Sequence, residues 1–148
     1  MKIGIISGYF QCFHKGHLAY LKEALNWCDK LIVLVQDDEH QFKKYGIGFN
    51  PVFSIITNIQ KAYNILENVP KMEIMVNHNN SVAEILKYIK QTHESDKLIF
   101  IKDGDRSWLS LPEDEKEVIE KNDIDFVYLG QPKIASSTAI LKGDINEF

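Results

Sequence analysis

Two histidines three residues apart, His14 and His17, are the side chains in this sequence best suited to chemistry. They close the stretch 7–17, which follows an apolar run at 3–6 and precedes residues with helical spacing from Leu18 onward. If a helix begins near His14, both imidazoles lie on one side of its first turn. From there they can donate hydrogen bonds to a phosphoryl group that gains negative charge in a transition state.

The residues around the histidines favour an anion as the ligand. Gly8 lets the backbone approach a ligand closely, and Gly16 adds no side chain between the imidazoles. The N–H groups at a helix start attract anions, so we expect phosphate there. Two alternatives stay open. One histidine can cap the helix while the other fills space, and a metal site would need a third ligand, which is not evident nearby.

The rest of the chain alternates between strand-like and helix-like segments, which predicts how the histidine turn is held. Apolar runs typical of buried strands alternate with segments of helical period. Ser81 and Glu84 have the spacing of a capping box, which predicts a helix start there. We therefore expect an α/β, Rossmann-like, doubly wound sheet of five parallel strands in the order 3-2-1-4-5, in three α/β/α layers. The predicted strands are 3–6, 31–35, 72–76, 97–101 and 125–129, and the predicted helices are 18–27, 52–67, 81–91, 114–121 and a short one ending at Gly143.

Three further segments are expected near the histidines, because the carboxyl ends of parallel strands share one edge. The loop 36–51 carries Lys43 and Lys44, which can bring positive charge to a phosphate, although by composition alone a solvated loop is the better explanation. The fourth strand is followed by Asp103, Gly104, Asp105 and Arg106, which suit a nucleoside and a phosphate or else a surface turn. The fifth strand is followed by three hydroxyl side chains, those of Ser136, Ser137 and Thr138. They can hold a phosphate or simply cap a helix.

Composition limits the class of protein. With 148 residues and 45% hydrophobic residues, we expect one domain spanning 1–148. A net charge of −4 argues against a sequence-independent nucleic-acid binder. Cys12 and Cys28 lack metal-ligand spacing, and no apolar run reaches membrane-spanning length, so we expect a cytoplasmic protein with no membrane partner and no protein-bound metal.

The motifs resemble one known family. Gly8-Tyr9-Phe10 with His14-Lys15-Gly16-His17 resembles the G-x-F-(D/N)-x-x-H-x-G-H signature of the cytidylyltransferase-like nucleotidyltransferases, the HxGH superfamily that includes glycerol-3-phosphate cytidylyltransferase. Segments 102–106 and 136–138 resemble the family's K-G-G-D and I-S-S/T-T motifs. Gln11 stands where many members have Asp or Asn, and Ala139 replaces a common lysine.

The resemblance implies an enzyme that transfers CMP from CTP to a small phosphorylated polyol, alcohol or sugar, releasing pyrophosphate. Mg²⁺ would be bound through the triphosphate, and a homodimer is expected by analogy. An adenylyltransferase that uses ATP, or a nucleotide-binding regulatory protein with weak catalysis, remains an alternative. By resemblance His14, His17 and Lys44 are catalytic, and Gln11, Lys43 and Lys133 lie by the acceptor. The nucleotide would contact Gly8, Tyr9, Phe10, Gly16, Asp103, Gly104, Asp105, Arg106, Ser136, Ser137 and Thr138.

Overall fold

The sheet has the predicted parallel order. In the computed structural model, which describes residues 1–104 and 107–130, five parallel strands are ordered β3-β2-β1-β4-β5. They are β1 (Lys2–Gly8), β2 (Lys30–Gln36), β3 (Lys71–Asn77), β4 (Lys97–Lys102) and β5 (Asp125–Tyr128). The order reverses between β1 and β4, so the crevice of the fold opens at the carboxyl ends of these two strands.

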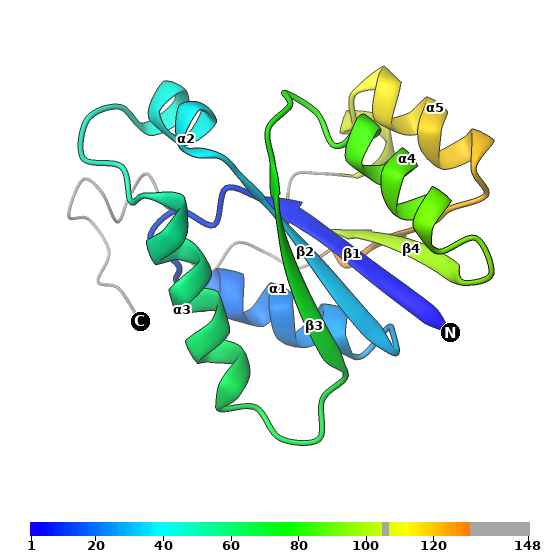
Figure 1. Ribbon diagram of the computed structural model, residues 1–148, viewed down its shortest axis with the longest axis horizontal. Helices are drawn as coiled ribbons and strands as arrows, with labels where there is room; N and C mark the ends of the chain where they lie inside the picture. Colours follow the sequence, from blue (N-terminus) through cyan, green and yellow to red (C-terminus); the bar gives the residue numbers. More distant parts are fainter. Residues whose placement is uncertain (105–106, 131–148) are drawn as a thin grey trace.

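Helices cover both faces of the sheet, as Figure 1 shows. One face packs against α1 (Lys15–Leu25) and α3 (Val52–Asn64), and the other against α4 (Ala83–Thr92) and α5 (Glu113–Lys121). Residues 31–35 of β2 are all apolar because the strand is buried on both sides, with Leu31 and Val33 in one core and Ile32 and Leu34 in the other. A short 3₁₀ turn, Trp108–Ser110, precedes α5.

One predicted loop contains a helix. Residues 36–51 are not irregular throughout, because Asp38–Tyr45 form α2. Asp37 caps this helix by accepting the His40 backbone N–H at 3.0 Å, and acidic residues in its first turn and lysines in its last turn complement the helix dipole. The helix ends at Gly46, whose φ of 75° disfavours other residues. The remaining loop, 46–51, leads into α3.

Two predictions about helices are not confirmed by the structure. The capping box predicted for Ser81 and Glu84 is wrong, because Val82 is the residue before α4 and Glu84 pairs with Lys87. Ser81 Oγ accepts the N–H of Ala83, the first residue of α4, at 3.2 Å and donates to Asp114. The short helix predicted to end at Gly143 lies outside the described residues. No helix within residues 1–104 and 107–130 is long and apolar enough to cross a membrane.

Gly4 marks the tightest contact between β1 and its surroundings. A Cβ at this position would lie 2.9 Å from Cys28 Sγ and 3.2 Å from Leu31 Cδ1. We therefore expect Gly4→Ala to lower the free energy of unfolding by about 1–3 kcal/mol, because it overpacks a closed interior. Urea denaturation measures this loss.

Cys28→Ala tests whether the clash with Cys28 Sγ causes the loss of stability. It removes the closest clashing atom, so the Gly4→Ala, Cys28→Ala double variant should be more stable than the sum of the single losses predicts. Strict additivity would mean that the loss in Gly4→Ala arises elsewhere.

Candidate active site

The turn between β1 and α1 is held in place by buried amides from distant residues. Gln11 is 0% exposed, and its Nε2 donates to Gln41 Oε1 at 2.9 Å and to the Asn50 carbonyl at 3.2 Å. The Asn50 backbone N–H donates to Gln11 Oε1, and the Cys12 N–H donates to Asn50 Oδ1 at 3.1 Å. Gln41 Nε2 donates to the Tyr9 carbonyl at 2.7 Å. The turn is therefore tied to α2 and to the loop before α3.

These bonds explain two unusual backbone conformations. Phe10 and Cys12 have φ values of 52° and 51°, a region that residues with a side chain rarely adopt. Such conformations persist where surrounding contacts over-determine them, and they gather at ligand sites. The predicted substrate contact of Gln11 is accordingly replaced by a structural one, because its amide faces the interior and fixes the turn.

His14 and His17 begin α1 by capping it reciprocally. The Nδ1 of His14 accepts the backbone N–H groups of Gly16 at 3.1 Å and His17 at 3.4 Å, while the Nδ1 of His17 accepts the His14 N–H at 3.2 Å. The two rings stack with centroids 3.7 Å apart and an angle of 14° between their planes. The part of the alternative in which one histidine caps the helix is therefore confirmed for His14, and donation to a phosphoryl group stays a prediction.

The capping bonds decide where each imidazole carries its proton. An Nδ1 that accepts a hydrogen bond has no hydrogen of its own, so in the neutral ring the proton sits on Nε2. Each histidine can then donate only through Nε2. One expectation is corrected here: the amides of Gly16 and His17 do not await an anion, because the His14 ring already accepts from both.

The same arrangement keeps His17 neutral. Burial, with a smaller contribution from the charge of His14, lowers the pKa of His17 from 6.5 to about 3. Phe10 and Phe13 supply part of that apolar surrounding, with ring centroids 5.3 Å and 5.5 Å from that of His17. At neutral pH this side chain is a neutral hydrogen-bond donor rather than a cation.

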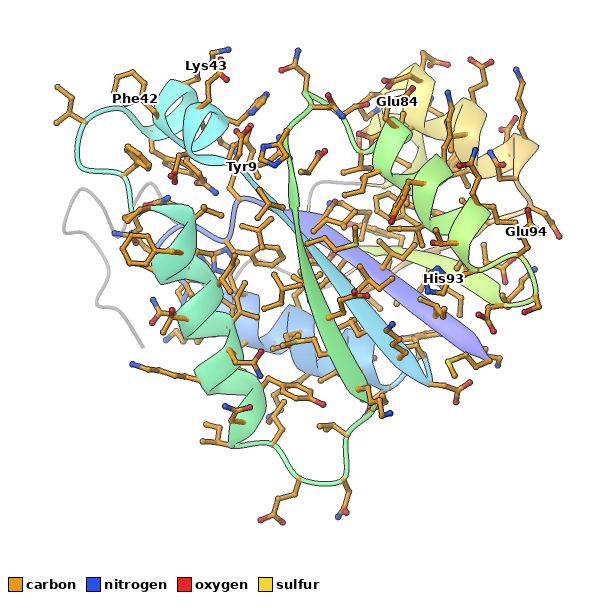
Figure 2. All side chains as sticks on the ribbon, in the orientation of Figure 1. Tyr9, Phe42, Lys43, Glu84, His93 and Glu94 are labelled. Atoms are coloured by element: carbon orange, nitrogen blue, oxygen red, sulfur yellow. The ribbon has the colours of Figure 1, made fainter. Side chains whose placement is uncertain are left out.

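The structure brings only one of the two predicted lysines to the turn. The Nζ of Lys44 lies 4.3 Å from the centroid of the Tyr9 ring, a cation–π distance. Lys43 instead pairs with Glu39 at 3.2 Å, and both side chains are exposed. Figure 2 shows Tyr9 beneath α2 and Lys43 projecting from the far side of that helix. The placement of Lys43 therefore does not support a contact with the acceptor.

The segment after β4 lies next to the turn, as far as it is described. Asp103 is close enough to Tyr20, on α1, for its charge to contribute to raising the pKa of that phenol. Gly104 has a φ of 63°, and its carbonyl accepts the Tyr128 hydroxyl at 2.6 Å. The predicted positions Asp105, Arg106, Lys133, Ser136, Ser137 and Thr138 lie outside the described residues.

A polar cluster at the ends of β2 and β3 anchors the start of α2. Asp37 Oδ1 accepts from His40 Nδ1 at 2.6 Å, its Oδ2 lies 3.0 Å from His78 Nδ1, and His40 Nε2 lies 2.8 Å from Asn80 Oδ1. Although burial opposes ionisation, the bonds from the histidines lower the pKa of Asp37 to about 2. Hydrogen bonds to Asp37 and Asn80 raise the pKa of His40. The cluster fixes α2, and through Gln41 it fixes the turn.

Sequence reasoning missed the residues that support the site. Gln41, Asn50 and Tyr20 carry no motif, and their spacing fits ordinary helix or loop positions. Lys102, the last residue of β4, was included in the motif-like segment 102–106 but was given no role, although charged residues at the carboxyl end of a parallel strand face the crevice. Among the described residues, no group of three or more His, Cys, Asp or Glu is placed to hold a metal ion.

Comparisons with known proteins identify similar chains and a matching family model. A family model described as cytidylyltransferase-like matches residues 5–143. The phosphopantetheine adenylyltransferase of Mycoplasma capricolum subsp. capricolum is 32% identical over 87 residues, which are 59% of this chain and 56% of that protein. The Streptococcus pneumoniae enzyme of the same name is 31% identical over 91 residues, 62% of this chain and 51% of the relative. The chain thus spans about half the length of the curated relatives it matches.

Two solved structures share the fold. A lipopolysaccharide core biosynthesis protein from Thermoplasma volcanium has a TM-score of 0.62 and 23% identity, covering 91% of this chain and 99% of that one. A putative nicotinate-nucleotide adenylyltransferase from Vibrio parahaemolyticus has a TM-score of 0.54 and 15% identity, covering 97% and 83%. At these identities the likeness concerns the fold alone.

The low pKa of His17 makes stability depend on pH. The unfolded imidazole titrates near 6.5 and the folded one near 3, so the unfolded chain binds the proton first as the pH falls. The stability that neutral His17 retains above about pH 6.5 is lost progressively toward about pH 3. His17→Gln removes the titration and keeps an acceptor for the capping bond.

We expect wild type to lose about 2 kcal/mol more than His17→Gln between about pH 7 and about pH 4.5 in urea denaturation. Asp37 and the other titrating groups are common to both proteins and cancel in the difference. Equal losses would contradict a neutral, buried His17.

Proposed function

Because the chain belongs to the cytidylyltransferase-like family, we propose that it is a nucleotidyltransferase that transfers AMP from ATP to a phosphorylated small-molecule acceptor. The relatives named above are phosphopantetheine adenylyltransferases, which favours ATP over the CTP that the sequence motifs put first. Phosphopantetheine is the acceptor to try first, since those relatives are named for it. Transfer of CMP from CTP is the second candidate, carried by the motif resemblance.

The single observation that carries this proposal is the stacked, reciprocally capped histidine pair at the switch point of the sheet. An acceptor phosphate already holds its nucleophilic oxygen, so the reaction needs no protein nucleophile and no general base. A bond forms between that oxygen and the α-phosphorus while the bond to the pyrophosphate oxygen breaks. The protein must align the groups and stabilise the charge that spreads over the α-phosphate.

The histidine donors suit that task. Donation through Nε2 from two rings held 3.7 Å apart would place two N–H groups on one phosphoryl group, with the tautomer set in advance by the helix cap. Lys44 is the lysine of α2 that lies against the turn, with its Nζ over the Tyr9 ring. It would approach the leaving pyrophosphate or the acceptor. Mg²⁺ would arrive with the triphosphate and neutralise part of its charge.

Substitutions that keep the helix cap separate the proposed chemistry from folding. His14→Asn retains an N-cap acceptor, and His17→Gln retains an acceptor at the third helical position. Both variants lose the imidazole Nε2–H, and once the amide oxygen caps the helix their NH₂ group does not stand where that N–H stood. We expect each variant to lower kcat about 10²–10³-fold, the cost of losing one transition-state donor. Stability at neutral pH should stay within about 1 kcal/mol of wild type.

Pyrophosphate release under single-turnover conditions measures the effect, with urea denaturation as the control. Variants that unfold more readily and lose activity in proportion would assign the histidines to the helix cap alone. Stable variants with full turnover would remove the pair from the reaction.

Nucleotide choice is tested by pyrophosphate release with ATP or CTP, each with phosphopantetheine and a panel of sugar, polyol and alcohol phosphates, with and without Mg²⁺. We expect turnover with ATP and one acceptor, and loss of turnover on chelation of Mg²⁺. Turnover with CTP alone would select the second candidate. Tight nucleotide binding with no release under any pairing would instead indicate a regulatory protein.

A further inference from the structure

A gap opens between β1 and β4 toward their carboxyl ends. The pairing of these strands stops at Ile5 and Phe100, although β1 continues to Gly8 and β4 to Lys102. On its other side, β1 stays paired with β2 as far as Gly8. The gap therefore lies at the β1–β4 boundary, where the strand order reverses and where ligands of this fold class bind.

The hydroxyl of Tyr20 reaches this gap from α1. It donates to the Ile101 carbonyl of β4, and the backbone N–H of Ser7 on β1 acts on the same oxygen. The side chain of Tyr20 is 4% exposed. Burial, together with the charge of Asp103, raises the pKa of Tyr20, so the hydroxyl keeps the proton that it donates. One phenol thus meets backbone groups of two strands that no longer pair with each other.

The Tyr20 bond differs from the other contact across this gap because it involves a helix. Lys102 Nζ lies 3.0 Å from the Ser7 carbonyl oxygen and 3.0 Å from Ser7 Oγ, and both of these residues belong to the sheet. Tyr20 belongs to α1, the helix that His14 and His17 begin. Its hydroxyl therefore ties the helix of the histidine pair to β4.

Tyr20 is also coupled to His17 by packing. The two residues are three apart on α1, so they lie on the same side of the helix. The Phe10 ring contacts both of them: its centroid is 6.3 Å from that of Tyr20, with the planes 20° apart, and 5.3 Å from that of His17, edge to face. Because closely packed interiors transmit strain, a shift of the phenol would reach His17 along the helix and through Phe10.

We propose that Tyr20 is a positioning residue for nucleotidyl transfer, whose hydroxyl, anchored on β4, sets where the histidine pair stands relative to the gap between β1 and β4. This inference rests on the proposed function. Alignment of donors is sensitive to small displacements, because a misplacement of about 1 Å that originates far from the chemistry can lower the rate about 10²-fold. An apolar ring would fill the same space in the core. The hydroxyl adds a directional bond to that filling.

The experiment compares two tyrosines that make the same kind of bond. Tyr20→Phe removes the hydroxyl and keeps the ring. Tyr63→Phe is the matched control, because Tyr63 packs against the same apolar core and its hydroxyl donates to the Pro70 carbonyl at 2.7 Å. Pro70 precedes β3, at the amino end of the strand and away from the gap. Both variants should lower the midpoint of urea denaturation to a similar extent, because each leaves one carbonyl without its phenol.

Only the first substitution should change the reaction. With saturating ATP and phosphopantetheine, we expect Tyr20→Phe to lower kcat about 10–100-fold and to leave KM for ATP within about threefold of wild type, because alignment is lost and binding is kept. Tyr63→Phe should keep kcat within about twofold of wild type. If wild type turns over CTP alone, the same comparison is made with CTP and the acceptor that it uses.

NMR of the histidine rings supplies a readout that does not depend on turnover. In wild type the ring nitrogens of His14 and His17 should show the Nε2–H tautomer that the helix cap sets. We expect their resonances to shift in Tyr20→Phe and to stay in place in Tyr63→Phe. Resonances that stay in place in both variants would overturn the inference, even if kcat fell.

The kinetic outcomes separate this inference from the proposed function. Unchanged kcat in Tyr20→Phe, or an equal loss of kcat in both variants, would overturn the inference and leave the proposed function intact. A raised KM for ATP with unchanged kcat would assign Tyr20 to the shape of the nucleotide site and would also overturn it. Wild-type protein that turns over neither ATP nor CTP would overturn the proposed function itself, and the inference with it.

Discussion

The exchange of hydrogen bonds between His14 and His17 is the interaction on which the candidate site depends. Each ring accepts a backbone N–H at the start of α1 through Nδ1, so the bonds that begin the helix also set the proton on Nε2. Burial and the neighbouring imidazole keep His17 neutral. The same hydrogen bonds therefore cap α1 and fix which ring nitrogen carries the proton in each histidine.

Support for this pair extends across the sheet. The turn adopts positive φ at Phe10 and Cys12 because Gln11 and Asn50 fix it from behind. Gln41 joins the turn to α2, and α2 is itself anchored at its first residues by the hydrogen bonds of Asp37 with His40 and His78. Polar side chains buried between elements thus do for the turn what apolar packing does for the sheet.

The sheet and the histidine turn were predictable because their signals are local. Apolar runs such as 31–35 indicate buried strands, and the strand-glycine-histidine order places the motif at the crevice. Helix α2 was missed although Asp37 and its charge pattern are helix signals, because its composition is that of a solvated loop. The Ser81 pattern misled because Ser81 bonds to Asp114, 33 residues away. The partners of Tyr20 and Lys102 lie on strands far apart in sequence, which no local pattern encodes.

Helix α1 carries both the imidazoles at its first turn and, one turn later, the phenol between β1 and β4. A small translation of α1 would therefore displace the two imidazoles and the Tyr20 hydroxyl together. The Ile101 carbonyl of β4, which accepts from this hydroxyl, therefore limits how far the histidine pair can shift along the sheet.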